Sequence, residues 1–220
     1  MRRGIAVVIA VCFLCGAGLL LPAFGQETTP IKLPQPKFEH NKTLFEALKD
    51  RKSSREYKSG NLSQQTLSNL LWAAWGIDRT DSGKRTAPSA LNRQEIEVYV
   101  ATAEGLYRYD PKANTLVPVL SQDIRALTGK QPYVKDGAVN LVYVADFAKM
   151  GEDPEAEKMI LAAADTGFIG QNVYLYCASE GLGTVFRASI DKPKLAETMK
   201  LRPDQRITFA QTVGLLKSEK

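Results

Sequence analysis

The sequence predicts an α+β domain in which helices pack on a mostly antiparallel β-sheet. Three observations support this prediction. Apolar and more polar residues alternate from Ile96 to Val100 before a tight turn at Gly105, which is typical of a β-hairpin. Residues 139–145 are apolar enough for a central strand. Residues 153–179 have the length and pattern of one long helix.

Composition and charge favour one globular domain and exclude several functions. The chain has 220 residues, of which 44% are hydrophobic and 24% charged. The net charge is +5, but basic residues are not striped with aromatic ones, so nucleic-acid binding is not predicted. The single histidine, His40, predicts neither a metal site nor a Ser-His or Cys-His pair. Outside the first 25 residues Cys177 stands alone, so no intrachain disulfide is expected.

Residues 1–25 have the pattern of a secretory signal peptide. Arg2 and Arg3 precede an apolar run that ends near Leu21, and Ala23-Phe24-Gly25 fits a cleavage site. An uncleaved membrane anchor is the alternative, although the run is short for a bilayer span. We therefore expect an exported protein, in the bacterial periplasm, with no membrane attachment after cleavage.

Residues 26–41 are rich in Pro, Lys, Thr and Gln and predict an extended linker that buries little. The folded domain is expected over residues 42–220. It begins with a capping box at Thr43 and Glu46, which starts a helix that runs to about Lys49. Its apolar side consists of Leu44, Phe45 and Leu48.

A second helix is predicted between Ser63, its N-cap, and Gly76, which ends it. Its apolar residues at helical spacing are Leu67, Leu70, Leu71, Ala74 and Trp75. We interpret Trp72 and Trp75 as core residues rather than as platforms for a ligand.

Further strands are predicted on either side of the central strand. The hairpin returns over residues 106–109, a third antiparallel strand follows over 116–120, and a short helix over 123–127. Two strand-like runs, 184–189 and 207–214, close the domain.

The long helix is predicted to start at Asp153-Pro154, with Pro at its first position, and to end before Gly181. It carries small residues on several sides, which allow another helix to approach closely. These are Ala162, Ala163, Ala164, Gly167, Gly170 and Ala178. We interpret it as the central helix of the domain, placed against its mate in a two-fold dimer.

Two polar segments are candidates for ligand binding. Residues 51–55, RKSSR, fit a solvated helix end, where basic residues are favourable. If the segment is extended, however, Arg51, Ser53 and Arg55 share one face and suit a phosphate. The glycine-rich phosphate loops of nucleotide-binding folds are missing.

The second segment precedes the hairpin. Pro88-Ser89-Ala90 is followed closely by Asn92, Arg93 and Gln94, which is more hydrogen-bonding capacity than a simple connection needs. This loop is expected to lie against a polar ligand.

Five segments, in this order, resemble the nitroreductase superfamily of FMN-dependent oxidoreductases. They are RKSSREY, LSQQTLSNLLWAAWGI, RTAPSALNRQEIEVYV, DTGFIGQNVYLYCASEGLGTVF and PDQRITFAQTVG. The resemblance covers about Thr43 to Gly214 and is greatest to the branch related to thiazoline and oxazoline oxidases. It implies a homodimer whose central sheet has helices on both faces.

The resemblance also implies a set of FMN-binding residues. Arg51, Ser53 and Arg55 match the basic motif that binds FMN. Pro88, Ser89, Ala90 and Asn92 match a loop that reaches across the dimer interface and covers the flavin of the other subunit. Arg187, Ala188 and Ser189 match a strand whose backbone passes flavin N5, Gln131 a glutamine at the polar edge of the ring, and Lys217 a basic residue near the phosphate.

Three positions depart from the family pattern. Leu91 stands where glycine is usual, Glu95 where proline is usual, and Ala188-Ser189 replaces a pair that commonly contains glycine. We expect these changes to alter the cover loop and the approach to N5.

The implied function is that of an FMN-dependent oxidoreductase in which the flavin carries the chemistry and no side chain is catalytic. The expected substrate is a small electron-poor compound such as a nitroaromatic, a quinone or an azoline. NAD(P)H is the usual reductant of the family but is scarce outside the cytoplasm. The alternative is a non-catalytic flavin- or small-molecule-binding module of the cell envelope.

Overall fold

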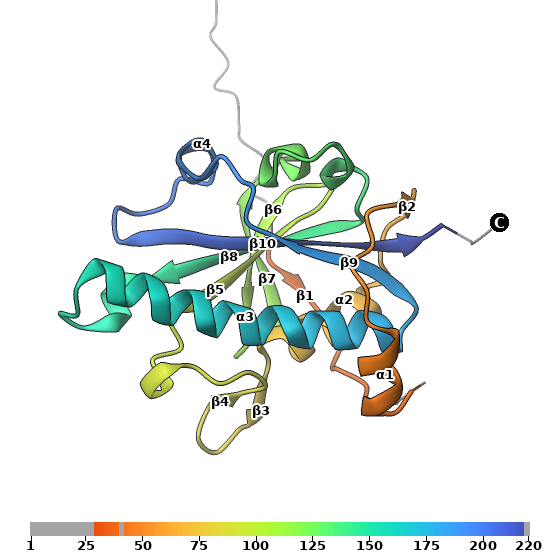
Figure 1. The fold of residues 1–220 in the computed structure, drawn as a ribbon, viewed down its shortest axis with the longest axis horizontal. Helices are drawn as coiled ribbons and strands as arrows, with labels where there is room; N and C mark the ends of the chain where they lie inside the picture. Colours follow the sequence, from red (N-terminus) through yellow and green to blue (C-terminus); the bar gives the residue numbers. More distant parts are fainter. Residues whose placement is uncertain (1–28, 40–41, 218–220) are drawn as a thin grey trace, which may run out of the picture.

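A computed structural model describes residues 29–39 and 42–217, and its core is one antiparallel sheet (Figure 1). In this part of the chain the strand order is β1-β7-β6-β5-β8-β10-β2, and β9 also pairs with β10. The strands are β1 (Ile31–Lys32), β2 (Tyr57–Lys58), β5 (Ile96–Ala101), β6 (Leu106–Asp110), β7 (Thr115–Leu120), β8 (Val139–Asp146), β9 (Leu182–Arg187) and β10 (Gln205–Leu216). A separate small hairpin consists of β3 (Ile77–Arg79) and β4 (Lys84–Arg85).

Strand β8 shows that both faces of the sheet are covered. All its residues are buried. Leu141 and Tyr143 point into one hydrophobic cluster, whereas Val142 and Val144 point into another. Because successive side chains of a strand alternate between faces, each cluster lies on its own side of the sheet. The predicted α+β architecture with helices on both faces is confirmed.

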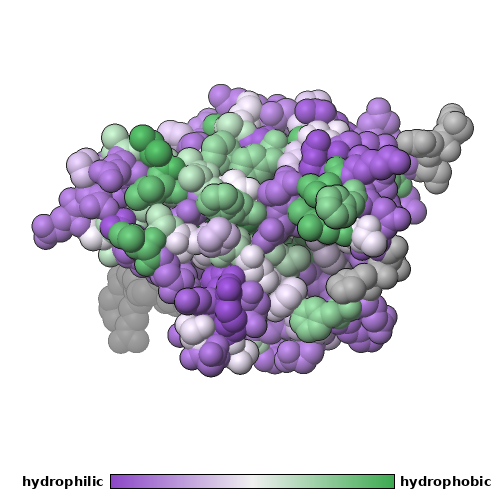
Figure 2. Space-filling view, turned by 60° about the horizontal axis from the view of Figure 1, so that its bottom comes forward, coloured by the Kyte–Doolittle hydropathy of each residue, from purple (hydrophilic) through white to green (hydrophobic). Residues whose placement is uncertain are grey.

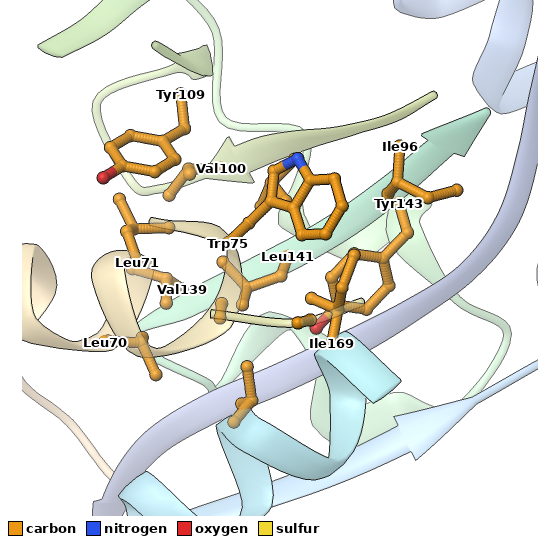
Figure 3. Close-up of a cluster of buried hydrophobic side chains, with 14 of the residues drawn as sticks. Leu70, Leu71, Trp75, Ile96, Val100, Tyr109, Val139, Leu141, Tyr143 and Ile169 are labelled. Atoms are coloured by element: carbon orange, nitrogen blue, oxygen red, sulfur yellow. The ribbon is translucent and has the colours of Figure 1, made fainter. Parts of the chain in front are cut away.

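The larger cluster lies between the sheet, α2 (Gln64–Trp75) and the long helix α3 (Glu155–Ser179). Figure 3 shows the α2 and α3 side chains gathered against β8. Trp75 is 2% exposed and belongs to this core, as predicted. Trp72 is half-buried, and its Nε1 donates to the Ile77 carbonyl at 3.2 Å.

The smaller cluster lies under α4 (Lys192–Thr198), on the opposite side of the sheet (Figure 1). Ile124, Leu195 and Met199 fill it. Two 3-10 segments, η2 (Arg125–Thr128) and η3 (Pro132–Lys135), lie in the connection from β7 to β8. The helix expected over residues 123–127 is thus a 3-10 turn that begins slightly later.

The helix ends follow local side-chain chemistry. Helix α1 (Leu44–Asp50) begins at the predicted capping box, in which the Thr43 amide donates to Glu46 at 2.7 Å. The Thr66 amide donates to Ser63 Oγ at 3.0 Å and caps α2. Pro154 is the N-cap of α3 rather than its first helical residue. These contacts connect residues only a few positions apart, so the sequence predicts them well.

The described part of the lead-in differs from a linker that buries little. Residues 29–39 are extended, but β1 pairs with β7 and Leu33 is 2% exposed. Asn114 Nδ2 also donates to the Pro34 carbonyl at 2.8 Å. This segment therefore completes the edge of the sheet. The predicted signal peptide, His40 and residue 41 lie outside the described residues.

The last two strands are longer than predicted, or shifted. The runs expected over 184–189 and 207–214 are β9 over 182–187 and β10 over 205–216.

Within residues 29–39 and 42–217, no helix combines the length and the apolar character needed to cross a bilayer.

Candidate functional site

The basic segment 51–55 leaves α1 in an extended conformation and joins the sheet. Arg51 caps the helix with φ −57° and ψ 120°, which takes the chain out of helical geometry. Three residues later the Ser54 amide donates to the Thr184 carbonyl of β9 at 2.8 Å. The segment is therefore held between α1 and β9, and is not a frayed helix end.

Tyr174 of α3 contacts two side chains of this segment, Arg51 and Ser53. Its hydroxyl lies 2.8 Å from Ser53 Oγ and accepts from the Phe186 amide of β9 at 3.0 Å. The Arg51 guanidinium lies 5.3 Å from the centre of the Tyr174 ring, within cation–π range. Arg51 and Ser53 thus share one face, as the alternation predicts. No feature of the sequence singled out Tyr174, because its partner Ser53 lies 121 positions away.

The arginines of this segment are available to an anion. Among the described residues, no carboxylate forms an ion pair with Arg51 or Arg55. Arg55 is exposed and makes one long contact, 3.5 Å, to the Ser53 carbonyl. A pocket of about 420 Å³ adjoins the segment and is lined by Lys52, Ser54 and Asp50 among others, whereas Arg51, Ser53 and Arg55 do not line it. Two guanidinium groups and a hydroxyl in this arrangement can bind a phosphate.

Lys217 lies at the far end of the same segment. Leu216 is the register partner of Tyr57, so the exposed Lys217 follows β10 just where the basic segment enters β2. This places Lys217 on the same edge of the sheet as the phosphate-binding candidates.

The end of β9 combines a buried arginine with an open backbone. Arg187 is 5% exposed, and its guanidinium donates to Thr128, Asn140 and Thr212 over 2.5–3.1 Å. Burial lowers the pKa of Arg187 to about 10. Its side chain is directed inward, so only its backbone can contact a ligand. Ala188 and Ser189, in contrast, are exposed.

Gln131 is close to this strand end but points inward. The Lys130 amide donates to the Ser189 carbonyl at 3.0 Å, which joins the two segments. Gln131 Oε1 is buried without a hydrogen-bond partner in the described chain. It crowds Gly129, where a Cβ would lie 2.9 Å from Gln131 Oε1 and 2.1 Å from Arg187 Nη1. Only glycine fits between these side chains.

The Pro88 loop is held to α3 in an unusual backbone conformation. Leu91, Asn92 and Gln94 have φ of 53°, 53° and 49°, in the left-handed region that glycine favours. Leu91 therefore adopts a conformation that glycine favours, although it carries a branched side chain. The loop is fastened where the Ala90 amide donates to Asp165 Oδ2 at 2.8 Å. The Gln94 amide also donates to Ser89 Oγ, at 3.0 Å.

One chain presents the two candidate segments at separate points of α3. The Pro88 loop meets the helix at Asp165 and the basic segment meets it at Tyr174. Nine residues of helix correspond to about 14 Å. Pro88 and Asn92 are exposed, so they can contact a neighbouring molecule.

Metal binding and thiol chemistry find no support in residues 29–39 and 42–217. No group of three His, Cys, Asp or Glu side chains there could hold a metal ion. Cys177 is 1% exposed, and burial raises the pKa of its thiol well above the usual range. This thiol is therefore a packing residue.

Fold and site together define an α+β protein in which a basic segment is hydrogen-bonded to the strand that ends at the exposed Ala188 and Ser189. The family model "Nitroreductase family" matches residues 48–215. A protein named as a nitroreductase in Methanocaldococcus jannaschii is 30% identical over 80% of this chain and 92% of its own length. The chain belongs to the nitroreductase family of oxidoreductases.

Two solved structures have a similar fold. A crystal structure from Ralstonia eutropha JMP134, described as a nitroreductase, has a TM-score of 0.83 and 41% identity over 90% of this chain and 94% of that one. An NADPH:FMN oxidoreductase from Vibrio harveyi, complexed with NAD+, has a TM-score of 0.59 and 20% identity. It covers 80% of this chain and 69% of that one, and at this identity it shows the fold alone.

Proposed function

We propose that this protein is an FMN-dependent oxidoreductase that works as a homodimer. It moves a hydride between a reductant and a small electron-poor compound such as a nitroaromatic, a quinone or an azoline of the thiazoline and oxazoline type. The single observation that carries the proposal is that the guanidinium groups of Arg51 and Arg55 form no ion pair in the described chain and flank Ser53 in a segment bonded to the start of β9. Family membership and the cofactor named for the Vibrio harveyi relative support it.

The donor set fits a flavin mononucleotide. Arg51, Ser53 and Arg55 would bind the phosphate through charge-assisted hydrogen bonds, with Lys217 adding a cation at the same edge. Backbone groups of Ala188 and Ser189 would contact the ring, because both residues are exposed. FMN would supply hydride transfer at N5. The chain's part is to bind, to orient and to leave one face of the ring open.

Exposed apolar side chains support the dimer. In the described chain Leu44, Phe45 and Leu48 of α1 are 61%, 82% and 45% exposed. On α3, Ile160 and Phe168 are 69% and 50% exposed. Figure 2 shows several separate apolar patches among the polar side chains of the face in view. In a homodimer these residues would be buried and the Pro88 loop would reach the partner's cofactor.

We also propose that residues 1–25 direct export and are removed, which would place the enzyme in the periplasm. Its electron donor there need not be NAD(P)H, because a soluble nicotinamide pool is not available outside the cytoplasm. Mass spectrometry of the protein from the periplasmic fraction tests this directly. An intact N-terminus in the membrane fraction would instead support a retained anchor.

The decisive experiment is a visible absorption spectrum of the purified full chain, before and after addition of FMN, followed by stopped-flow mixing with NADH and NADPH. We expect flavin bands, bleaching by a reductant, and recovery of the bands on addition of a quinone or nitroaromatic. Absence of flavin bands and of FMN uptake would remove the proposal. Bands that bleach with dithionite but turn over no acceptor would support the non-catalytic flavin-binding module.

A further inference from the structure

Two buried acidic side chains face one another beneath the Pro88 loop. Glu95, the last residue before β5, is 0% exposed, and Asp165 of α3 is 3% exposed. Both Glu95 carboxyl oxygens are buried without a hydrogen-bond partner in the described chain. The Asp165 carboxyl is within hydrogen-bonding reach of Glu95. An unpartnered buried carboxylate is costly, so this arrangement requires a physical explanation.

A proton shared between the carboxyl groups of Glu95 and Asp165 explains how both can be buried. Two adjacent buried carboxylates cannot both carry a charge without strong repulsion, and neither can donate to the other when both are ionised. If Glu95 holds a proton, it donates to Asp165. Asp165 Oδ2 then remains free to accept from the Ala90 amide, as observed at 2.8 Å. Burial, above all, and the neighbouring Asp165 together raise the pKa of Glu95 to about 7.

The charged groups around the pair have other partners. Lys149 is near enough to lower the pKa of Glu95 slightly, but its ammonium contacts the Gln94 carbonyl at 3.5 Å and Asp146 at 3.9 Å. Elsewhere around the loop, Arg93 pairs with Asp153 at 2.7 Å and Arg202 with Asp146 at 3.0 Å. Within residues 29–39 and 42–217, no cation forms an ion pair with Glu95.

The loop above the pair depends on this anchor. Three of its residues have positive φ, which non-glycine residues adopt only when surrounding contacts hold them. The Ala90–Asp165 bond links the middle of the loop to α3, and Asn172 Nδ2 of α3 donates to the Thr86 carbonyl at 3.3 Å at its start; Glu95 ends the loop where it enters the sheet.

We propose that Glu95 and Asp165 share one proton and that this acid pair positions the Pro88 loop. The pair acts through the loop and does not touch the reacting atoms, so both are positioning residues. The part of the inference that concerns cofactor affinity rests on the proposed function. The part that concerns the loop does not.

The pH dependence has a definite sign. The protonated form of Glu95 is favoured in the folded chain, so the anchor is intact at low pH and weakens as the pH rises through about 7. If only the protonated form holds the loop, the apparent Kd for FMN increases about tenfold between pH 6 and pH 8. Over the same interval the exchange rates of the loop amides should rise by more than their intrinsic rates do, because the loop loses protection.

The test is hydrogen–deuterium exchange of residues 86–95, corrected for intrinsic rates, together with FMN titrations from about pH 5.5 to 8.5. In Glu95→Gln the amide donates to Asp165 at every pH, so both profiles should become flat and remain at the low-pH level. Glu197→Gln, on exposed α4 across the sheet, is the matched control and should keep the wild-type profiles.

Asp165→Asn is a second variant that does not depend on Glu95→Gln folding well. Its amide group would donate to the Glu95 carboxylate while its oxygen accepts from Ala90, so it should also flatten the exchange profile. A wild-type exchange profile that is already flat, or unchanged profiles in both variants, would overturn the acid pair. If the exchange profiles of the loop are as expected but FMN does not bind at any pH, the acid pair is upheld and the proposed function is rejected.

Discussion

At the scale of single residues, the Tyr174 hydroxyl connects the two ends of the candidate site. It contacts Ser53 of the basic segment at 2.8 Å and accepts from the Phe186 amide at 3.0 Å on the strand that leads to Ala188. Removal of this hydroxyl leaves the Phe186 amide without its acceptor and frees the Ser53 side chain. The aromatic ring that faces Arg51 would remain.

We predict that Tyr174→Phe weakens FMN binding without unfolding the protein. One lost hydrogen bond of about 0.5–1.5 kcal/mol corresponds to a two- to tenfold increase in Kd. Quenching of flavin fluorescence on titration measures the effect. Tyr107→Phe, on β6, is the matched control and should leave Kd unchanged. A Kd for FMN in Tyr174→Phe equal to that of the wild-type protein would show that the hydroxyl does not organise the site.

We predict that Arg51→Gln lowers the affinity for FMN and leaves that for riboflavin unchanged. The reason is that riboflavin lacks the phosphate that the guanidinium would bind. A charge-assisted bond is worth about 1.5–3 kcal/mol, so the preference for FMN should fall by about ten- to a hundredfold. Isothermal titration with each flavin measures this. Lys49→Gln, exposed in the last turn of α1, controls for net charge. Equal losses for both flavins would place Arg51 away from the phosphate.

Residue-scale prediction from sequence succeeded where the pattern is local. Alternation alone places Arg51 and Ser53 on one face once the segment is extended. Tyr174 and the burial of Glu95 could not be predicted in this way. Their roles depend on partners 121 and 70 positions away, which only the packing of α3 against the loop and sheet brings close.

At the scale of elements, one buried arginine connects the C-terminal end of β9, which pairs with β10, to two further elements. The Arg187 guanidinium binds η2 through Thr128, β8 through Asn140 and β10 through Thr212. All these partners are neutral, so the group is held by hydrogen bonds rather than by an ion pair. The exposed residues that follow β9 are thereby fixed relative to the loops at this end of the sheet.

We predict that Arg187→Met destabilises the fold by about 2–4 kcal/mol, because the buried carbonyl of Thr128 and the side chain of Asn140 lose their donors. Urea denaturation followed by circular dichroism measures the change. Arg108→Met, on β6, removes a 41% exposed arginine with one contact at 3.7 Å to Glu97 and should cost under about 1 kcal/mol. Equal stability of the two variants would contradict the structural role of Arg187.

Long elements were predicted from sequence, whereas two short elements, β1 and α4, were not. The apolar run of β8 and the periodicity of α3 extend over many residues, so each gives an unambiguous signal. Strand β1 has two residues, and α4 has seven with Pro193 near its start. Pairing with β7 and burial of Leu195 determine these elements. Both are tertiary contacts that local propensity does not contain.

At the scale of the whole molecule, the sequence predicted the apolar side of α1 but not what covers it. Only Ala47 of this helix is buried within the chain. A single chain therefore leaves Leu44, Phe45 and Leu48 exposed, beside the exposed face of α3. On that face Gly167 has open space where a Cβ would lie, so a second helix can approach closely. A second copy of the chain accounts for all three observations.

We predict that Phe45→Asp and Ile160→Asp shift the protein from dimer to monomer, because each would bury an unpaired carboxylate in the proposed interface. Sedimentation velocity over a range of protein concentrations measures the change, and FMN binding should weaken in parallel because the loop would no longer reach the partner's site. Lys194→Asp, exposed on α4 across the sheet, should remain dimeric. Ile160 lies 14 positions before Tyr174 on α3, so a loss of FMN that follows dissociation of Ile160→Asp would assign the site to both chains. A wild-type monomer that binds FMN fully would place the whole site within one chain.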